Sequence, residues 1–138
     1  MKIVIFSILI FMAVVSRADR NDVLMLERTV DRNLILAFPN DDKITPKISD
    51  FEVINYVLMS NELGERWCVV TLKNNSSGNR IFENTQLMAL FSDGNRKAPL
   101  HYKLSFKGRE TQSITISFGV SKFPILTIYS SNDTQPDA

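Results

Sequence analysis

The sequence predicts an all-β domain, an antiparallel sandwich of about seven strands, and two observations carry this prediction. Apolar side chains recur at every second position in much of the chain after Phe51, the period of a strand with one buried face. Turn-forming residues separate these segments at spacings of roughly 8 to 12 residues, as in sandwiches and barrels. The second half of the chain lacks the three-and-four spacing of an amphipathic helix.

The first clear strand is predicted at Phe51–Ser60, which is rich in β-branched and aromatic residues. A turn follows at Asn61–Gly64, and the next strand is predicted at Arg66–Lys73. That strand alternates strictly, and the side chains that we place in the core are Cys68, Val70 and Leu72.

A polar loop is predicted at Asn74–Asn79, whose residues favour turns. The next strand, Thr85–Ser92, runs into the Asp93-Gly94 pair, a strong hairpin or turn signal. Pro99 marks a bend, so we predict that Leu100–Phe106 is an edge strand, because proline cannot donate to a central ladder.

After a turn at Lys107-Gly108, the clearest alternation in the chain predicts a strand at Thr111–Gly119. Its predicted core positions are Ile114, Ile116 and Phe118. The last strand is predicted at Phe123–Tyr129, with Leu126 and Ile128 in the core. Ser130–Ala138 is polar and is expected to fray, with the flexible tail proper at residues 131–138.

Residues 22–38 are ambiguous, because they fit either one amphipathic helix or two short strands. We favour strands at Val23–Leu26 and Leu34–Phe38, followed by a loop at Pro39–Pro46. Residues 19–50 would then supply the N-terminal strands and loop of the domain, and residues 51–130 its sandwich core.

The first 18 residues have the three parts of a secretory signal. Lys2 supplies the positive charge, an apolar run covers residues 3–15, and Ser16 and Ala18 stand at the positions that a signal peptidase reads. The run is too short to span a bilayer as a helix, which needs roughly 20 residues. We therefore expect cleavage after Ala18, no stable membrane span afterwards, and a periplasmic or secreted domain; an uncleaved anchor is the alternative.

Removal of residues 1–18 would leave 14 basic and 15 acidic residues, since Lys2 and Arg17 are two of the 16 basic residues of the chain. This balance argues against nucleic-acid binding, which needs a basic excess. Cys68 is the only cysteine, so no internal disulfide can form.

Three segments together resemble a bacterial extracytoplasmic immunoglobulin-like sandwich. They are Val69–Ser76, then Met88 and Leu90 before the Asp93-Gly94 turn, and then Gly108–Phe118. The resemblance covers about half of the chain that would remain after cleavage and implies a fold and an exported setting. It implies no catalytic residue, because such folds host many unrelated functions.

No motif for catalysis, phosphate binding or metal binding is present in the sequence. His101 is the only histidine, and a Cys68–His101 nucleophilic pair is disfavoured because Cys68 falls on the predicted core face. Asp41-Asp42 lacks the regular oxygen spacing of a calcium loop. We therefore predict no enzyme, no cofactor and no metal.

One region is basic and interleaved with aromatic residues, and it is the candidate binding patch. Its members are Arg96, Lys97, His101, Tyr102, Lys103, Lys107 and Arg109. Such a surface suits an anionic polymer, lipid headgroups or an acidic protein surface.

The favoured hypothesis is a non-enzymatic exported module that binds another envelope or secreted protein, as an accessory or assembly factor. An exposed edge would receive a strand of the partner, at Leu100–Phe106 or at the first strand of the chain. The alternatives are anion or glycan binding through residues 96–109 and, less favoured, a small hydrolase that uses Cys68 and His101.

Overall fold

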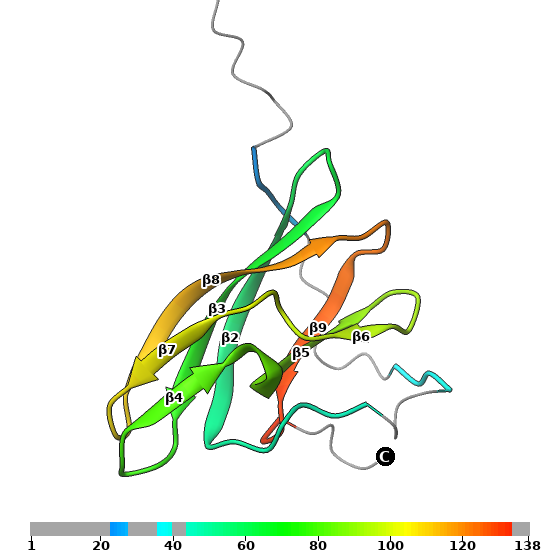
Figure 1. The fold of residues 1–138 in the computed structure, drawn as a ribbon. Helices are drawn as coiled ribbons and strands as arrows, with labels where there is room; N and C mark the ends of the chain where they lie inside the picture. Colours follow the sequence, from blue (N-terminus) through cyan, green and yellow to red (C-terminus); the bar gives the residue numbers. More distant parts are fainter. Residues whose placement is uncertain (1–22, 28–35, 40–43, 134–138) are drawn as a thin grey trace, which may run out of the picture.

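The computed structural model describes residues 23–27, 36–39 and 44–133, and Figure 1 draws the remainder as a grey trace. The described residues form nine strands and one short 3₁₀ turn at Asn84–Gln86. The strands are β1 (Met25–Leu26), β2 (Phe51–Ser60), β3 (Glu65–Asn74), β4 (Arg80–Glu83), β5 (Leu87–Phe91), β6 (Arg96–Lys97), β7 (Lys103–Phe106), β8 (Thr111–Val120) and β9 (Ile125–Ser130).

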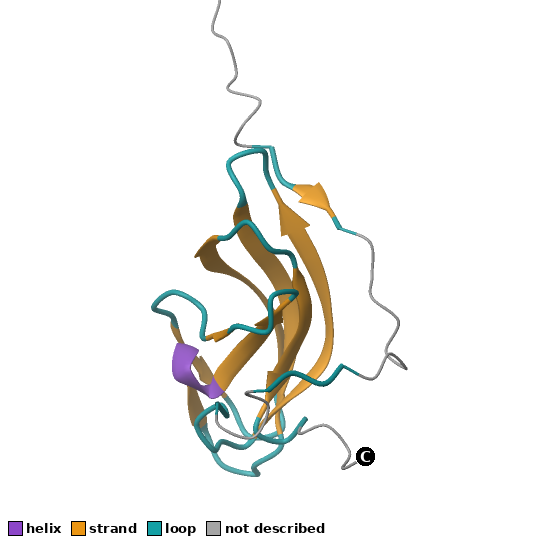
Figure 2. Cartoon of the chain, turned by 90° about the vertical axis from the view of Figure 1, so that its right-hand side faces the viewer, coloured by secondary structure: helices purple, strands orange, loops and turns teal. Residues whose placement is uncertain are grey.

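All strand pairs in the described residues are antiparallel, and those residues contain no α-helix, so the all-β prediction is confirmed. One sheet has the order β1-β2-β3-β8, and its long strands curve along one side of the molecule in Figures 1 and 2. The opposing side consists of a three-stranded sheet, β6-β5-β9, and the pair β4-β7.

Alternation decides which side chains enter the core. Cys68, Val70 and Leu72 of β3 are fully buried, as predicted. Ile116 and Ile114 of β8 stand opposite the first two of them and are buried as well. The predicted face of β8 is therefore confirmed.

A cluster of phenylalanine rings joins β2 to the β4-β7 pair. The Phe51 ring meets the rings of Phe82 and Phe106 edge to face, at centroid distances of 5.4 and 4.9 Å. All three side chains are at most 1% exposed. Edge-to-face pairs place the positive ring edge against the negative ring face, which adds to the gain from burying the rings.

Strand β4 was not predicted, and the expected strand at Thr85–Ser92 begins only at Leu87. The intervening residues form the 3₁₀ turn, because the Gln86 side chain accepts a hydrogen bond from the Glu83 backbone N–H (2.9 Å). This capping arrangement takes residues 84–86 out of the ladder.

The second predicted N-terminal strand, Leu34–Phe38, is wrong where it is described, because Leu36–Phe38 form neither strand nor helix. The Phe38 ring instead covers the turn at Gly94, where an added Cβ would lie 2.7 Å from it. Within the other predicted segment, Met25–Leu26 forms β1 and pairs with the end of β2. The predicted signal at residues 1–18 lies outside the described residues.

The predicted core face of β9 is only half right. Ile128 is buried, but Ile125 is buried in place of Leu126, which stays half-exposed. The register between β5 and β9 shifts between Leu90 and Phe91, which is the mark of a β-bulge. A bulge adds one residue and so reverses the alternation on one side of it.

The start of the predicted tail is fixed rather than frayed. A carboxylate oxygen of Asp133 accepts hydrogen bonds from the N–H groups of Val53 (3.1 Å) and Ser130 (2.9 Å). The Asn132 side chain donates to the carbonyl of Phe51 (2.8 Å). These bonds join β9 to β2, which belong to different sheets. Residues 134–138 lie outside the described part.

Arg66 stabilises the opposite end of the long sheet. Its guanidinium forms an ion pair with Glu27, which follows β1, and donates to the carbonyls of Ser121 and Lys122 between β8 and β9. Both side chains of the ion pair are largely buried, at 12% and 17% exposed. Arg66→Met should therefore lower the free energy of unfolding by about 2–3 kcal/mol, measured by urea unfolding.

Arg80→Met is the matched control, because the ion pair of Arg80 with Asp50 is about half-exposed at 47% and 50%. Such a pair contributes at most about 1 kcal/mol. Equal losses in the two variants would contradict the role assigned to Arg66.

Candidate functional site

Strands β7 and β8 are consecutive, yet they belong to different sheets. β7 pairs with β4, and β8 pairs with β3, so each of the two strands has one edge without a strand partner in the described residues. We call the outward-facing peptide groups of Thr111, Ser113 and Thr115 the β8 edge.

Two backbone hydrogen bonds fix the direction of these peptide groups. The carbonyl of Glu110 accepts from the N–H of Asn74 at the end of β3 (2.9 Å), and the carbonyl of Ser117 accepts from the N–H of Leu100, outside the sheet (2.8 Å). Peptide groups alternate along a strand, so even-numbered residues face β3 and odd-numbered ones face outward. The backbone N–H and C=O groups of Ser113 and Thr115 therefore face away from β3. Neither residue has a backbone hydrogen-bond partner among the described residues.

Neither a charged side chain nor a proline protects the β8 edge against pairing. The ten residues of β8 (TQSITISFGV) include no charged residue and no proline. Native proteins commonly blunt exposed edges with such residues or with a covering segment. A neutral edge with unpaired peptide groups is a template for another strand.

The neighbouring edge of β7 is protected. Lys103 lies opposite Glu83 on β4 and forms an ion pair with it (3.7 Å). A hydrogen bond from Lys47, together with the charges of Lys47 and Lys103, lowers the pKa of Glu83 below its usual value. Of the edge segment predicted at Leu100–Phe106, only the last four residues form the strand.

Two contacts limit the open part of the β8 edge. At one end the Gln112 side chain donates to the carbonyl of Ser105 on β7 (3.1 Å). At the other end the backbone N–H of Leu100 donates to the carbonyl of Ser117, which is therefore not free to pair. The free peptide groups therefore run from Thr111 to Thr115.

A buried asparagine holds the beginning of β8 in place. Asn74 is fully buried, and its amide donates to the carbonyls of Gly78 (2.9 Å) and Lys107 (3.0 Å). Its side-chain oxygen accepts from the N–H of Ser76 (3.0 Å). Asn74 thus joins the β3–β4 loop to the β7–β8 turn.

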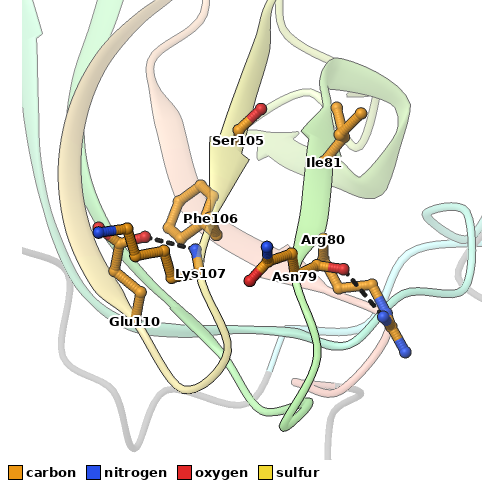
Figure 3. A pocket seen from close by; sticks show the side chains of 7 residues that line it. All are labelled: Asn79, Arg80, Ile81, Ser105, Phe106, Lys107 and Glu110. Carbon is orange, nitrogen blue, oxygen red and sulfur yellow. Dashed lines mark hydrogen bonds between the residues drawn. The ribbon is translucent and has the colours of Figure 1, made fainter.

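A hollow of about 490 Å³ lies beside these loops (Figure 3). Its lining residues are Asn79, Arg80, Ile81, Ser105, Phe106, Lys107 and Glu110. Two of its charged side chains already have internal partners: Arg80 donates to Asp50 (2.8 Å), and Glu110 accepts from the Lys107 N–H. The hollow is open, and nothing in it selects a particular ligand.

The basic residues of the predicted patch are distributed along several elements. Arg96 and Lys97 lie on β6, over the rings of Tyr129 and Phe91 respectively, each at 5.4 Å from the ring centroid. The Tyr102 ring packs toward Phe82, with 6.4 Å between the centroids.

The other members lie elsewhere: Lys103 on β7, exposed His101 before it, and exposed Lys107 and Arg109 in the β7–β8 turn. Ligand binding by these seven residues remains a prediction.

Cys68 lies in the middle of β3 and is fully buried, and burial raises the pKa of its thiol to about 12. At neutral pH the group is thus the protonated thiol, which is a poor nucleophile. We expect no reaction of native Cys68 with a thiol reagent at pH 8 and complete reaction in denaturant. Rapid labelling of the folded chain would contradict this assignment.

Among the described residues, no group of three or more His, Cys, Asp or Glu side chains is arranged to hold a metal ion. No helix in that part of the chain is long and apolar enough to cross a membrane. No protein-family model, curated protein or solved structure matches this chain. The candidate site therefore rests on the geometry of the β8 edge.

Proposed function

We propose that this chain is a non-enzymatic protein-binding module that pairs its β8 edge with an extended segment of protein. One observation carries the proposal: the neutral β8 strand presents outward-facing peptide groups that have no backbone partner in the described residues. Unpaired N–H and C=O groups along an open sheet edge are a template for an added strand, which pairs with them through backbone hydrogen bonds.

The setting is part of the same proposal. The signal-like pattern at residues 1–18 supports export, and the resemblance to immunoglobulin-like sandwiches supports the periplasm or envelope of a bacterium. There the module would act as an accessory or assembly factor. Mass spectrometry of the exported protein should find Asp19 as its first residue.

Photo-cross-linking tests the proposed contact. A photoreactive amino acid at Thr115 should give an adduct with protein in living cells, because its side chain stands beside the proposed partner strand. The same group at Asn95, an exposed residue of the β5–β6 turn, is the control and should give none. Absence of an adduct at Thr115, or equal yields at both positions, would refute the proposal.

A further inference from the structure

We infer that the strand received by the β8 edge is β8 of a second copy of this chain. The inference rests on the proposed function, since it names the partner of the same site. The two copies would pair antiparallel about a two-fold axis, so that two four-stranded sheets become one continuous sheet. Such isologous contacts, with the same surface on both sides, are the commonest in protein dimers.

The composition of β8 makes it compatible with itself. Like charges that face each other across a ladder are destabilising, and a neutral strand brings none to the contact. The solvent-facing side chains of the segment from Thr111 to Thr115 all carry hydroxyl groups; they are Thr111, Ser113 and Thr115. Hydroxyl pairs across strands are favourable, and the Thr71 and Ser113 hydroxyls already form one within the chain (2.8 Å).

The register follows from the peptide groups that remain free. The Ser117 carbonyl already accepts a hydrogen bond from the Leu100 N–H. The outward-facing peptide groups that remain free to pair with another strand are therefore those of Thr111, Ser113 and Thr115. Two-fold antiparallel pairing uses all three only if Ser113 stands opposite Ser113 and Thr111 opposite Thr115. This register gives about six inter-chain hydrogen bonds.

The same register keeps the charged turns of the two copies apart. Lys107 and Arg109 precede Thr111, so they lie beyond one end of the paired segment. Those of the second copy lie beyond the other end. Arg109 would be separated from Arg109 of the second copy by about eight residues of strand, roughly 27 Å, which exceeds the Debye length at physiological ionic strength.

Cysteine cross-linking tests this register. Opposed residues in hydrogen-bonded pairs have Cα atoms about 5.5 Å apart, which suits a disulfide. Ser113→Cys should therefore form a covalent dimer under mild oxidation, at least ten-fold faster than Thr115→Cys, whose partner position is Thr111. Native Cys68 is buried and does not compete. Both substituted side chains are exposed, so both variants should fold, as circular dichroism checks.

A mixture supplies the complementary result. Thr111→Cys and Thr115→Cys chains should cross-link to each other when mixed, and much less when each is oxidised alone. Equal cross-linking of Ser113→Cys and Thr115→Cys, or a chain that stays monomeric at all concentrations in sedimentation, would overturn self-pairing. If the Thr115 photo-adduct contains a different protein, self-pairing is refuted and the proposed function stands. Absence of any adduct would remove both.

Discussion

Replacing Gly108 with alanine should lower the free energy of unfolding by about 3 kcal/mol. A Cβ at this position would lie 2.0 Å from the carbonyl oxygen of Ser77 and 2.6 Å from its carbon. Both are backbone atoms of the β3–β4 loop, which the Asn74 side chain holds through hydrogen bonds to Gly78 and Ser76. Neither atom can move aside without breaking these hydrogen bonds. Urea unfolding followed by circular dichroism measures the loss.

Gly78→Ala is the matched control, since it lies in the facing loop. The nearest atom to its added Cβ is the end of the flexible Arg80 side chain, at 3.1 Å. We expect a change within about 0.5 kcal/mol. A Gly108→Ala variant as stable as Gly78→Ala would mean that the two loops do not touch as described.

Asn74→Ala should cost about 3 kcal/mol as well, for a different reason. The substitution leaves the carbonyls of Gly78 and Lys107 and the N–H of Ser76 without their partner beneath the partly buried loops that fully buried Asn74 joins. Unsatisfied buried groups lose their hydration and regain nothing, which costs about 1–3 kcal/mol each when water cannot reach them. Asn74→Asp should not rescue stability, because its carboxylate cannot donate to the two carbonyls.

Asn75→Ala provides the comparison, because the half-buried Asn75 amide makes a single side-chain hydrogen bond within the described residues, to the Glu52 carboxylate (3.1 Å). Its loss should be about 1 kcal/mol or less. Similar values for the two asparagines in the same urea titrations would contradict the role of Asn74 as the link between the loops.

Periodicity predicts the long strands well, because a strand with one buried face must alternate. Phe51–Ser60 agrees with β2 in both bounds, and the buried apolar residues of β3 and β8 are those expected from the pattern. Each of these strands has several core positions, so the signal accumulates over its length.

Short or irregular elements carry too little of that signal. β4 has a single buried side chain, Phe82, between polar or exposed neighbours, and one position cannot establish a period. In β9 a bulge reverses the alternation, so the pattern gives Leu126 where the structure buries Ile125. The bonds of Asp133 to β2 join residues about 80 positions apart, and no local pattern contains that information.

The candidate site could be predicted only in part. The sequence predicts β8 as a strand, but whether a strand lies at an edge depends on the order of strands in the sheet. The one local hint is that β8 has no charged residue, and a buried central strand would share that property. Asn74 also reads as an ordinary loop residue until β3 and the β7–β8 turn are brought together.

Amide hydrogen exchange along β8, resolved by NMR, tests the open edge most directly. In dilute solution the amides of Ser113 and Thr115 should exchange rapidly, while those of Ile114 and Ile116, which face β3, exchange slowly. At higher protein concentration, Ser113 and Thr115 should become protected as strands pair across the edge. Slow exchange of all four amides at the lowest concentration would mean that the edge is already covered within one chain, and would contradict the account.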